Sequence, residues 1–100
     1  MKMPKSFYIE GSKTLIFRRE GDKYITFDPE KLEFSRLNII GAELLYLVSL
    51  NLNYNNIKKH FISKYNISDD TISKDIELFF NNFSCTNLIS NKLQSLEINI

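Results

Sequence analysis

The side chains that most often carry catalysis or bind metals are scarce in this chain. His60 is the only histidine and Cys85 the only cysteine among 100 residues. A zinc site needs several such ligands, and a Cys–His nucleophile pair needs other supporting groups, so neither is favoured. The three glycines, Gly11, Gly21 and Gly41, stand singly and form no phosphate-binding loop. The sequence therefore argues against an enzyme, and we expect neither a metal nor a cofactor.

The length and composition are those of one ordinary globular domain. Hydrophobic residues make up 43% and charged residues 25%, and 13 basic against 12 acidic side chains give a net charge of +1. This balance favours neither a nucleic acid nor a membrane as partner. Residues 1–10 lack the apolar run of a signal peptide, and the uncharged stretch 44–57 is too short to cross a bilayer. Because a single cysteine also excludes an intrachain disulfide, we expect a cytoplasmic protein.

Three β-rich runs separated by turn residues predict an antiparallel sheet. They are LIFRR at 15–19, KYITF at 23–27 and LEFSRLN at 32–38. Glu-Gly-Asp joins the first two runs, and Asp-Pro-Glu-Lys joins the last two, with proline preset for the first corner of the turn. Alternation along the second and third runs predicts that these apolar side chains lie on the buried face: Ile25, Phe27, Leu32 and Phe34.

After the third run, the apolar spacing changes from that of a strand to that of a helix. Asn38 suits the N-cap of a first helix, which we predict over about 39–50. A second helix is predicted over 54–65. A third helix is predicted to be capped by Ser68 or Asp70 and to end near residue 82.

The expected fold class is α+β. It is a winged helix-turn-helix in which an N-terminal three-stranded antiparallel sheet precedes three helices, in the order β-β-β-α-α-α. We expect this domain to occupy residues 15–89, after an N-terminal segment at 1–14. Residues 90–100 are expected to be a C-terminal tail or linker, with a last strand as the alternative.

Several residues follow one another in the order of a known family pattern. They are Leu37-Asn38 at the strand-to-helix junction, Gly41-Ala42 and Leu44-Leu45 in the first helix, Ile57 in the second and Asp75-Ile76 in the third. In this order and spacing, the stretch 15–89 resembles the PqqD family. Its members are recognition elements for ribosomally synthesised and post-translationally modified peptides (RiPPs), and they bind the leader peptides of the precursors.

Two departures from the family pattern concern turns. The Asp-Gly pair that often ends the first helix is replaced by Ser-Leu-Asn at 49–51, and the glycine usual after the third helix is missing from NNFSCTNLIS. The resemblance implies that a leader peptide lies as an extra strand between the third strand and the third helix. It also implies a modifying enzyme as second partner, a radical SAM enzyme or a cyclodehydratase, separate from this chain or fused to it.

The candidate site follows from an unpaired strand edge and a helical wheel. An extended peptide can pair with the backbone of an open edge strand, and nearby pockets then select its side chains. The open edge at 32–37 predicts contacts from Leu32, Glu33, Phe34, Ser35 and Arg36. On the third helix, one flank beside the core stripe carries Thr71, Asp75, Leu78 and Asn82, and the other carries Ser73, Glu77 and Ser84. The wheel leaves open which flank faces the strand, and we predict the first.

Two alternatives come from other functional classes. A winged-helix regulator would read DNA with its third helix, but residues 68–83 carry four acidic side chains against Lys74 alone, which phosphates would repel. A scaffold that forms a homodimer would pair an open edge or its N-terminal hairpin with a second copy. One sheet edge could also be covered within the chain, by SFYIEG at 6–11 or LEINI at 96–100.

Overall fold

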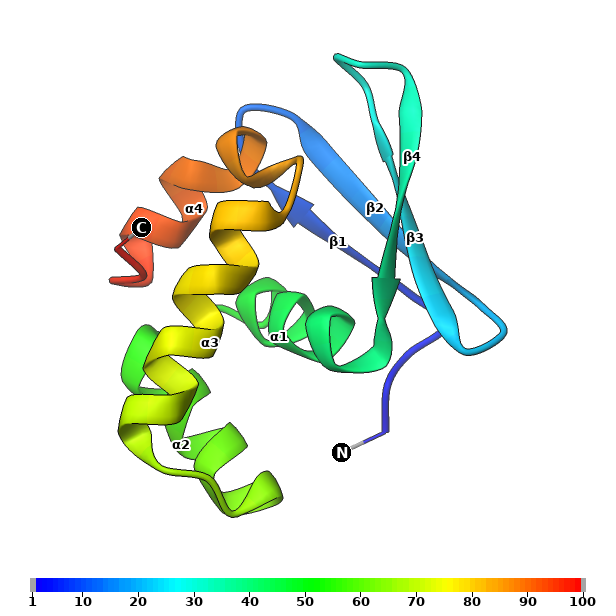
Figure 1. Cartoon of the computed structure of the whole chain (residues 1–100). Helices are drawn as coiled ribbons and strands as arrows, with labels where there is room; N and C mark the ends of the chain where they lie inside the picture. The colour runs from blue at the N-terminus through cyan, green and yellow to red at the C-terminus, as the bar shows by residue number, and fades with distance from the viewer. Residues whose placement is uncertain (1, 100) are drawn as a thin grey trace.

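The computed structural model describes residues 2–99 as one antiparallel sheet followed by helices (Figure 1). The sheet is a meander of four strands in chain order: β1 (Ser6–Glu10), β2 (Thr14–Glu20), β3 (Lys23–Asp28) and β4 (Glu33–Asn38). Helix α1 lies between one face of this sheet and the α2–α3 pair (Figure 1).

The predicted three-stranded sheet is wrong, because the N-terminal segment adds a strand. β1 pairs with β2 from Ser6–Arg18 to Glu10–Thr14, and so covers the edge of β2. Phe7 and Ile9 are buried while their neighbours are exposed. This alternation is short, with only two inward side chains, and the strand depends on its partner for stability.

The predicted facing of β3 and β4 is also wrong. The buried side chains of β3 are Tyr24, Thr26 and Asp28, whereas Phe27 is 42% exposed. Register pairs Phe27 with Phe34, so Phe34 shares the outer face and is 62% exposed. Both faces of β3 carry large apolar side chains, so alternation alone could not choose between them.

Three helices lie where the apolar spacing places them, and each begins at a polar cap. They are α1 (Ile39–Ser49), α2 (Tyr54–Tyr65) and α3 (Asp69–Asn82). The Asn38 side chain accepts a hydrogen bond from Gly41 N–H at 2.8 Å, and Ser68 Oγ accepts one from Thr71 N–H at 3.1 Å. These bonds satisfy backbone donors that the first turn of a helix leaves unpaired.

The count of three helices is wrong as well. A 3-10 helix, η1 (Thr86–Ile89), runs directly into a fourth helix, α4 (Ser90–Ser95). Leu93 and Ile98 are buried in the common core, and Leu96 C=O accepts a hydrogen bond from Tyr54 N–H at 2.8 Å. The C-terminal segment is therefore helical and packed. Ile100 lies outside the described residues.

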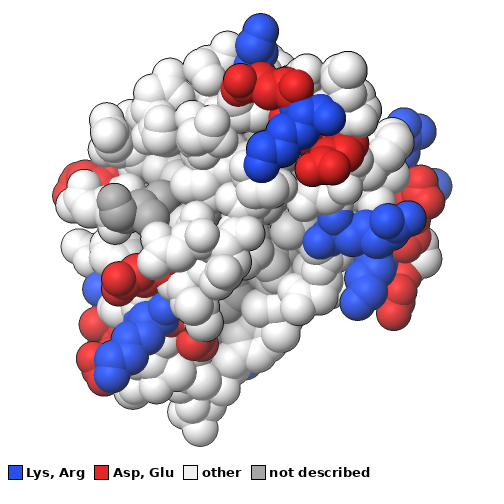
Figure 2. Space-filling model, turned by 45° about the horizontal axis from the view of Figure 1, so that its top comes forward, with Lys and Arg blue, Asp and Glu red and all other residues white. Residues whose placement is uncertain are grey.

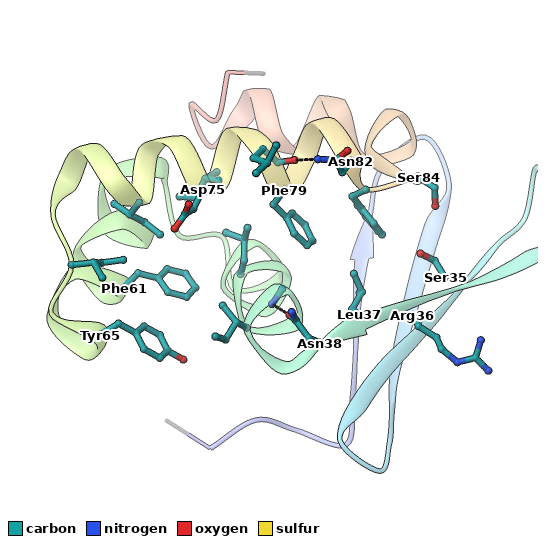
Figure 3. Close-up of a pocket in the computed structure, with 18 residues that line it drawn as sticks. Ser35, Arg36, Leu37, Asn38, Phe61, Tyr65, Asp75, Phe79, Asn82 and Ser84 are labelled. Carbon is teal, nitrogen blue, oxygen red and sulfur yellow. Dashed lines mark hydrogen bonds between the residues drawn. The ribbon is translucent and has the colours of Figure 1, made fainter.

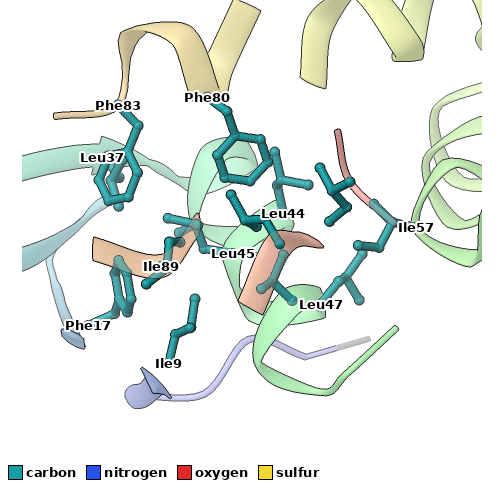
Figure 4. Packing of buried hydrophobic residues seen from close by; sticks show 14 of the residues in the cluster. Ile9, Phe17, Leu37, Leu44, Leu45, Leu47, Ile57, Phe80, Phe83 and Ile89 are labelled. Atoms are coloured by element: carbon teal, nitrogen blue, oxygen red, sulfur yellow. The ribbon is translucent and has the colours of Figure 1, made fainter. Parts of the chain in front are cut away.

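The core fills the space between the sheet, α1 and the C-terminal helices (Figure 4). The rings of Phe7 and Phe17 stack with centroids 4.8 Å apart, and Phe80 and Ile89 are at most 2% exposed. One polar atom interrupts this packing. Thr26 Oγ1 is buried on the inner face of β3, and no donor or acceptor within residues 2–99 reaches it.

Replacing this threonine with valine should stabilise the protein. Thr26→Val removes a buried hydroxyl without changing the shape of the side chain, so we expect the free energy of unfolding to rise by about 1 kcal/mol. Urea denaturation followed by circular dichroism measures the change. Thr26→Ser keeps the hydroxyl and should give no gain. A loss of stability in Thr26→Val would mean that the hydroxyl has a hydrogen-bond partner in solution.

Candidate functional site

A groove of about 660 Å³ runs between the free edge of β4 and helix α3 (Figure 3). The start of α1 contributes Ile40 and Leu44, and the end of α2 closes one end with Phe61 and Tyr65. Most of the lining is apolar. A volume of this size is typical of pockets that enclose small ligands or a few large side chains.

Gly41 allows α3 to approach α1 closely beside this groove. A Cβ atom at Gly41 would lie 2.7 Å from Cε1 of Phe79, which is closer than side chains pack. The Phe79 ring points from α3 into the groove (Figure 3). The Asn38 cap fixes the corner between β4 and α1 next to this contact. The groove is thus built on rigid elements and not on loops.

The structure brings five of the nine predicted site residues into this groove. From α3 they are Asp75, Leu78 and Asn82, and from β4 they are Ser35 and Arg36. The four that do not line it are Thr71, Leu32, Glu33 and Phe34. Leu32 lies in the turn before β4 with φ +56°. Of the other helix flank, Ser84 lines the groove, and its side chain faces that of Ser35 (Figure 3).

The hydrogen-bond pattern of the sheet decides which backbone groups of β4 are free. Arg19 N–H donates to Lys5 C=O at 2.8 Å, so these two opposite residues form a hydrogen-bonded pair of the β1–β2 ladder. Along an antiparallel strand pair, hydrogen-bonded and non-hydrogen-bonded residue pairs alternate. The registers of the three strand pairs therefore show which residues of β2, β3 and β4 bond to which neighbouring strand. In β4, the odd-numbered residues bond to β3. The N–H and C=O groups of Phe34 and Arg36 therefore point outward, and no strand within residues 2–99 pairs with them.

Charge is sparse in the groove. Asp75 on α3 and Arg36 on β4 are its only charged lining residues, and the Arg36 side chain points away from the cavity (Figure 3). Leu78 is 62% exposed on the α3 wall, one turn before Asn82, whose Nδ2 donates to Leu78 C=O at 2.8 Å. The groove therefore suits apolar side chains, with one carboxylate on its wall.

The residues that α2 contributes, Phe61 and Tyr65, were not among the site residues predicted from the sequence. Tyr65 is held by a buried carboxylate, because its hydroxyl donates to Glu43 Oε1 at 2.8 Å. Lys64 Nζ lies 3.0 Å from both oxygens of Glu43, and His60 Nε2 lies 2.5 Å from Oε2. A glutamate inside the apolar run IIGAELLYLV is the signal that could have pointed to this cluster.

The Glu43 cluster keeps its carboxylate ionised. Burial alone would raise the pKa of Glu43, which is 1% exposed, but hydrogen bonds from His60, Tyr65 and Lys64 outweigh it and lower the pKa below its usual range. Burial raises the pKa of Tyr65, and its bond to Glu43 raises it further. At neutral pH the cluster is therefore a fixed charge network that joins α1 to the α2 wall of the groove.

Other kinds of site find little support in residues 2–99. No group of three His, Cys, Asp or Glu side chains could hold a metal ion there. Cys85 is fully buried, and burial raises the pKa of its thiol. Acidic and basic side chains are intermixed on the face in Figure 2, around an uncharged middle.

No helix of the described chain is both long and apolar enough to cross a membrane. Comparisons with protein-family models, curated proteins and solved structures find no match for this chain.

Proposed function

We propose that this protein binds an extended peptide as an added strand on β4, and that this peptide is the leader of a RiPP precursor. One observation carries the proposal: the outward backbone groups of Arg36 border an apolar groove, and those of Phe34 continue the same free edge. The backbone of an incoming strand would pair with these groups. Every second side chain of that strand would then enter the groove.

The order of residues that resembles the PqqD family supports the same assignment. Leu37 and Asn38 form the junction of β4 with α1, and Asp75 and Ile76 lie on the α3 wall, so these four matching positions line the groove. In this proposal the protein catalyses nothing. It holds the precursor beside a separate or fused modifying enzyme in the cytoplasm, and raises the local concentration of the segment to be modified.

Proline at position 36 tests strand addition directly. Because Arg36 N–H points outward, Arg36→Pro removes a donor to the peptide without breaking the β3–β4 ladder. We expect it to weaken peptide binding about tenfold or more, while Arg36→Ala changes affinity less than about threefold. The probe is a fluorescein-labelled synthetic peptide, the N-terminal half of the short precursor encoded beside this chain's gene, followed by fluorescence anisotropy.

An amide chemical-shift titration with the same peptide locates the site. Shifts should concentrate on β4 and on residues 75–84, and a DNA duplex should cause none there. Saturable binding that Arg36→Pro leaves unchanged would exclude strand addition at β4. Shifts with DNA alone would favour the regulator instead.

A further inference from the structure

The sheet has a second free edge, at β1, and it also borders a hollow. This hollow encloses about 690 Å³ and is lined by all five residues of β1. Its other wall comes from the C-terminal end of α1 and from α4, including Tyr46, Leu50 and Lys92. Leu50 is an apolar side chain that is 48% exposed there. The edge therefore has space beside it for another strand.

The backbone groups of β1 that face this space follow from two hydrogen bonds. Arg19 N–H donates to Lys5 C=O, and Gly11 N–H donates to Lys13 C=O at 3.1 Å. Odd-numbered residues of β1 therefore bond to β2. The N–H and C=O groups that point outward belong to Ser6, Tyr8 and Glu10.

We propose that this edge pairs with β1 of a second copy of the chain, antiparallel, with the two-fold axis at Tyr8. In this register Tyr8 lies opposite its own copy and Ser6 lies opposite Glu10, so all the outward groups of Ser6, Tyr8 and Glu10 are paired. A register with the axis nearer the N-terminus of β1 would place Pro4 in the new ladder, and proline has no N–H to donate. A register with the axis nearer the C-terminus of β1 would bring the two Glu10 side chains together, which like charges disfavour.

The outer face of the sheet supports the same register. A row of exposed apolar side chains crosses all four strands: Tyr8, Ile16, Phe27 and Phe34, which are 59%, 62%, 42% and 62% exposed. Tyr8 pairs with Ile16 across β1 and β2, and Phe27 with Phe34 across β3 and β4, with ring centroids 5.2 Å apart. Since the axis passes at Tyr8, the rows of the two copies join into one, and each tyrosine covers part of the other.

This association leaves the proposed function at β4 untouched. The two β4 edges lie at the far ends of the joined sheet, so each copy keeps a free groove. The dimer thus holds two peptide sites that face away from each other. It would arise from β1 whether or not β4 binds a peptide.

Charge substitutions at Ser6 test the register. Because Ser6 faces the partner's Glu10, Ser6→Lys should strengthen association and Ser6→Glu should weaken it, each by roughly two- to thirtyfold over the two symmetric contacts. The double change Ser6→Glu with Glu10→Lys should restore association. Sedimentation equilibrium over about 10 µM to 1 mM reads the dissociation constant of the whole chain.

Proline substitutions at the two edges separate this proposal from the β4 proposal. Tyr8→Pro removes an outward donor from β1 and should leave the chain monomeric but folded, with peptide binding unchanged. Arg36→Pro should leave the dimer intact. A wild-type chain that stays monomeric throughout the concentration range overturns the proposal. So does a dimer that Arg36→Pro dissociates and Tyr8→Pro does not, or one in which Ser6→Lys and Ser6→Glu act alike.

Discussion

Removing two of the three donors to Glu43 should destabilise the protein by about 3–5 kcal/mol at neutral pH. The variant is His60→Leu with Lys64→Met, which leaves the carboxylate bonded to Tyr65 alone. Glu43 is 1% exposed, so the ionised carboxylate would keep too few hydrogen-bond partners in the folded variant. Urea denaturation at pH 7.5 measures the difference from the wild type.

A third substitution provides the control. Adding Glu43→Leu to the double variant removes the uncompensated charge and should recover most of the lost stability, because an apolar side chain suits a site that is already buried. If the triple variant is no more stable than the double one, the loss comes from packing of the α1–α2 contact and not from the buried charge.

The pH dependence of the double variant has a definite sign. In the wild type the pKa of Glu43 is lowered, so its contribution to stability is present at neutral pH and is lost as the pH falls below the usual glutamate range, about 4.3. In the variant, burial acts with only one opposing hydrogen bond, so the carboxyl should take up its proton at higher pH. The deficit relative to the wild type should therefore shrink between pH 7.5 and pH 4.5. A deficit that stays constant would contradict the charge explanation.

Much of the helical part of the fold could be predicted because its signals are local. Asn38 and Ser68 cap helices through bonds to residues three positions ahead, so short stretches of sequence contain both partners. The flank of α3 that carries Asp75 and Leu78 was also predictable, since the buried stripe of the helix fixes the directions of all its remaining side chains. Part of the groove could therefore be predicted from the sequence.

The features that were missed depend on contacts between distant segments. β1 is a short strand that forms because β2 supplies its partner, and the inner face of β3 is chosen by what packs against it. The wall formed by Phe61 and Tyr65 comes from α2, whose apolar stripe looked like ordinary core. Position along the chain gives no information on which of these surfaces meet. The groove on β4 and the hollow on β1 both arise from such meetings.

The turn between β1 and β2 lies in close contact with the backbone of η1. Gly11→Ala should therefore lower the free energy of unfolding by about 3 kcal/mol. A Cβ atom at Gly11 would lie 2.0 Å from Leu88 C=O and 2.8 Å from Ile89 Cα. Both are backbone atoms of η1, which cannot rotate aside as a side chain would. The same carbonyl accepts a hydrogen bond from Ser12 N–H at 2.8 Å, so displacing η1 would also lengthen this bond.

Gly21→Ala is the matched control, because Gly21 is a glycine for a different reason. It has φ +61° in the β2–β3 turn and no atom within 4 Å of its Cβ position, so alanine there should cost only about 1–2 kcal/mol of backbone strain. Urea denaturation compares the two variants, and amide hydrogen exchange shows where protection is lost. For Gly11→Ala, protection should fall together in β1, in η1 and in α4, since the sheet and the C-terminal helices share one core. Equal costs for the two alanines would mean that the turn is free to move away from η1, and that β1 is held by β2 alone.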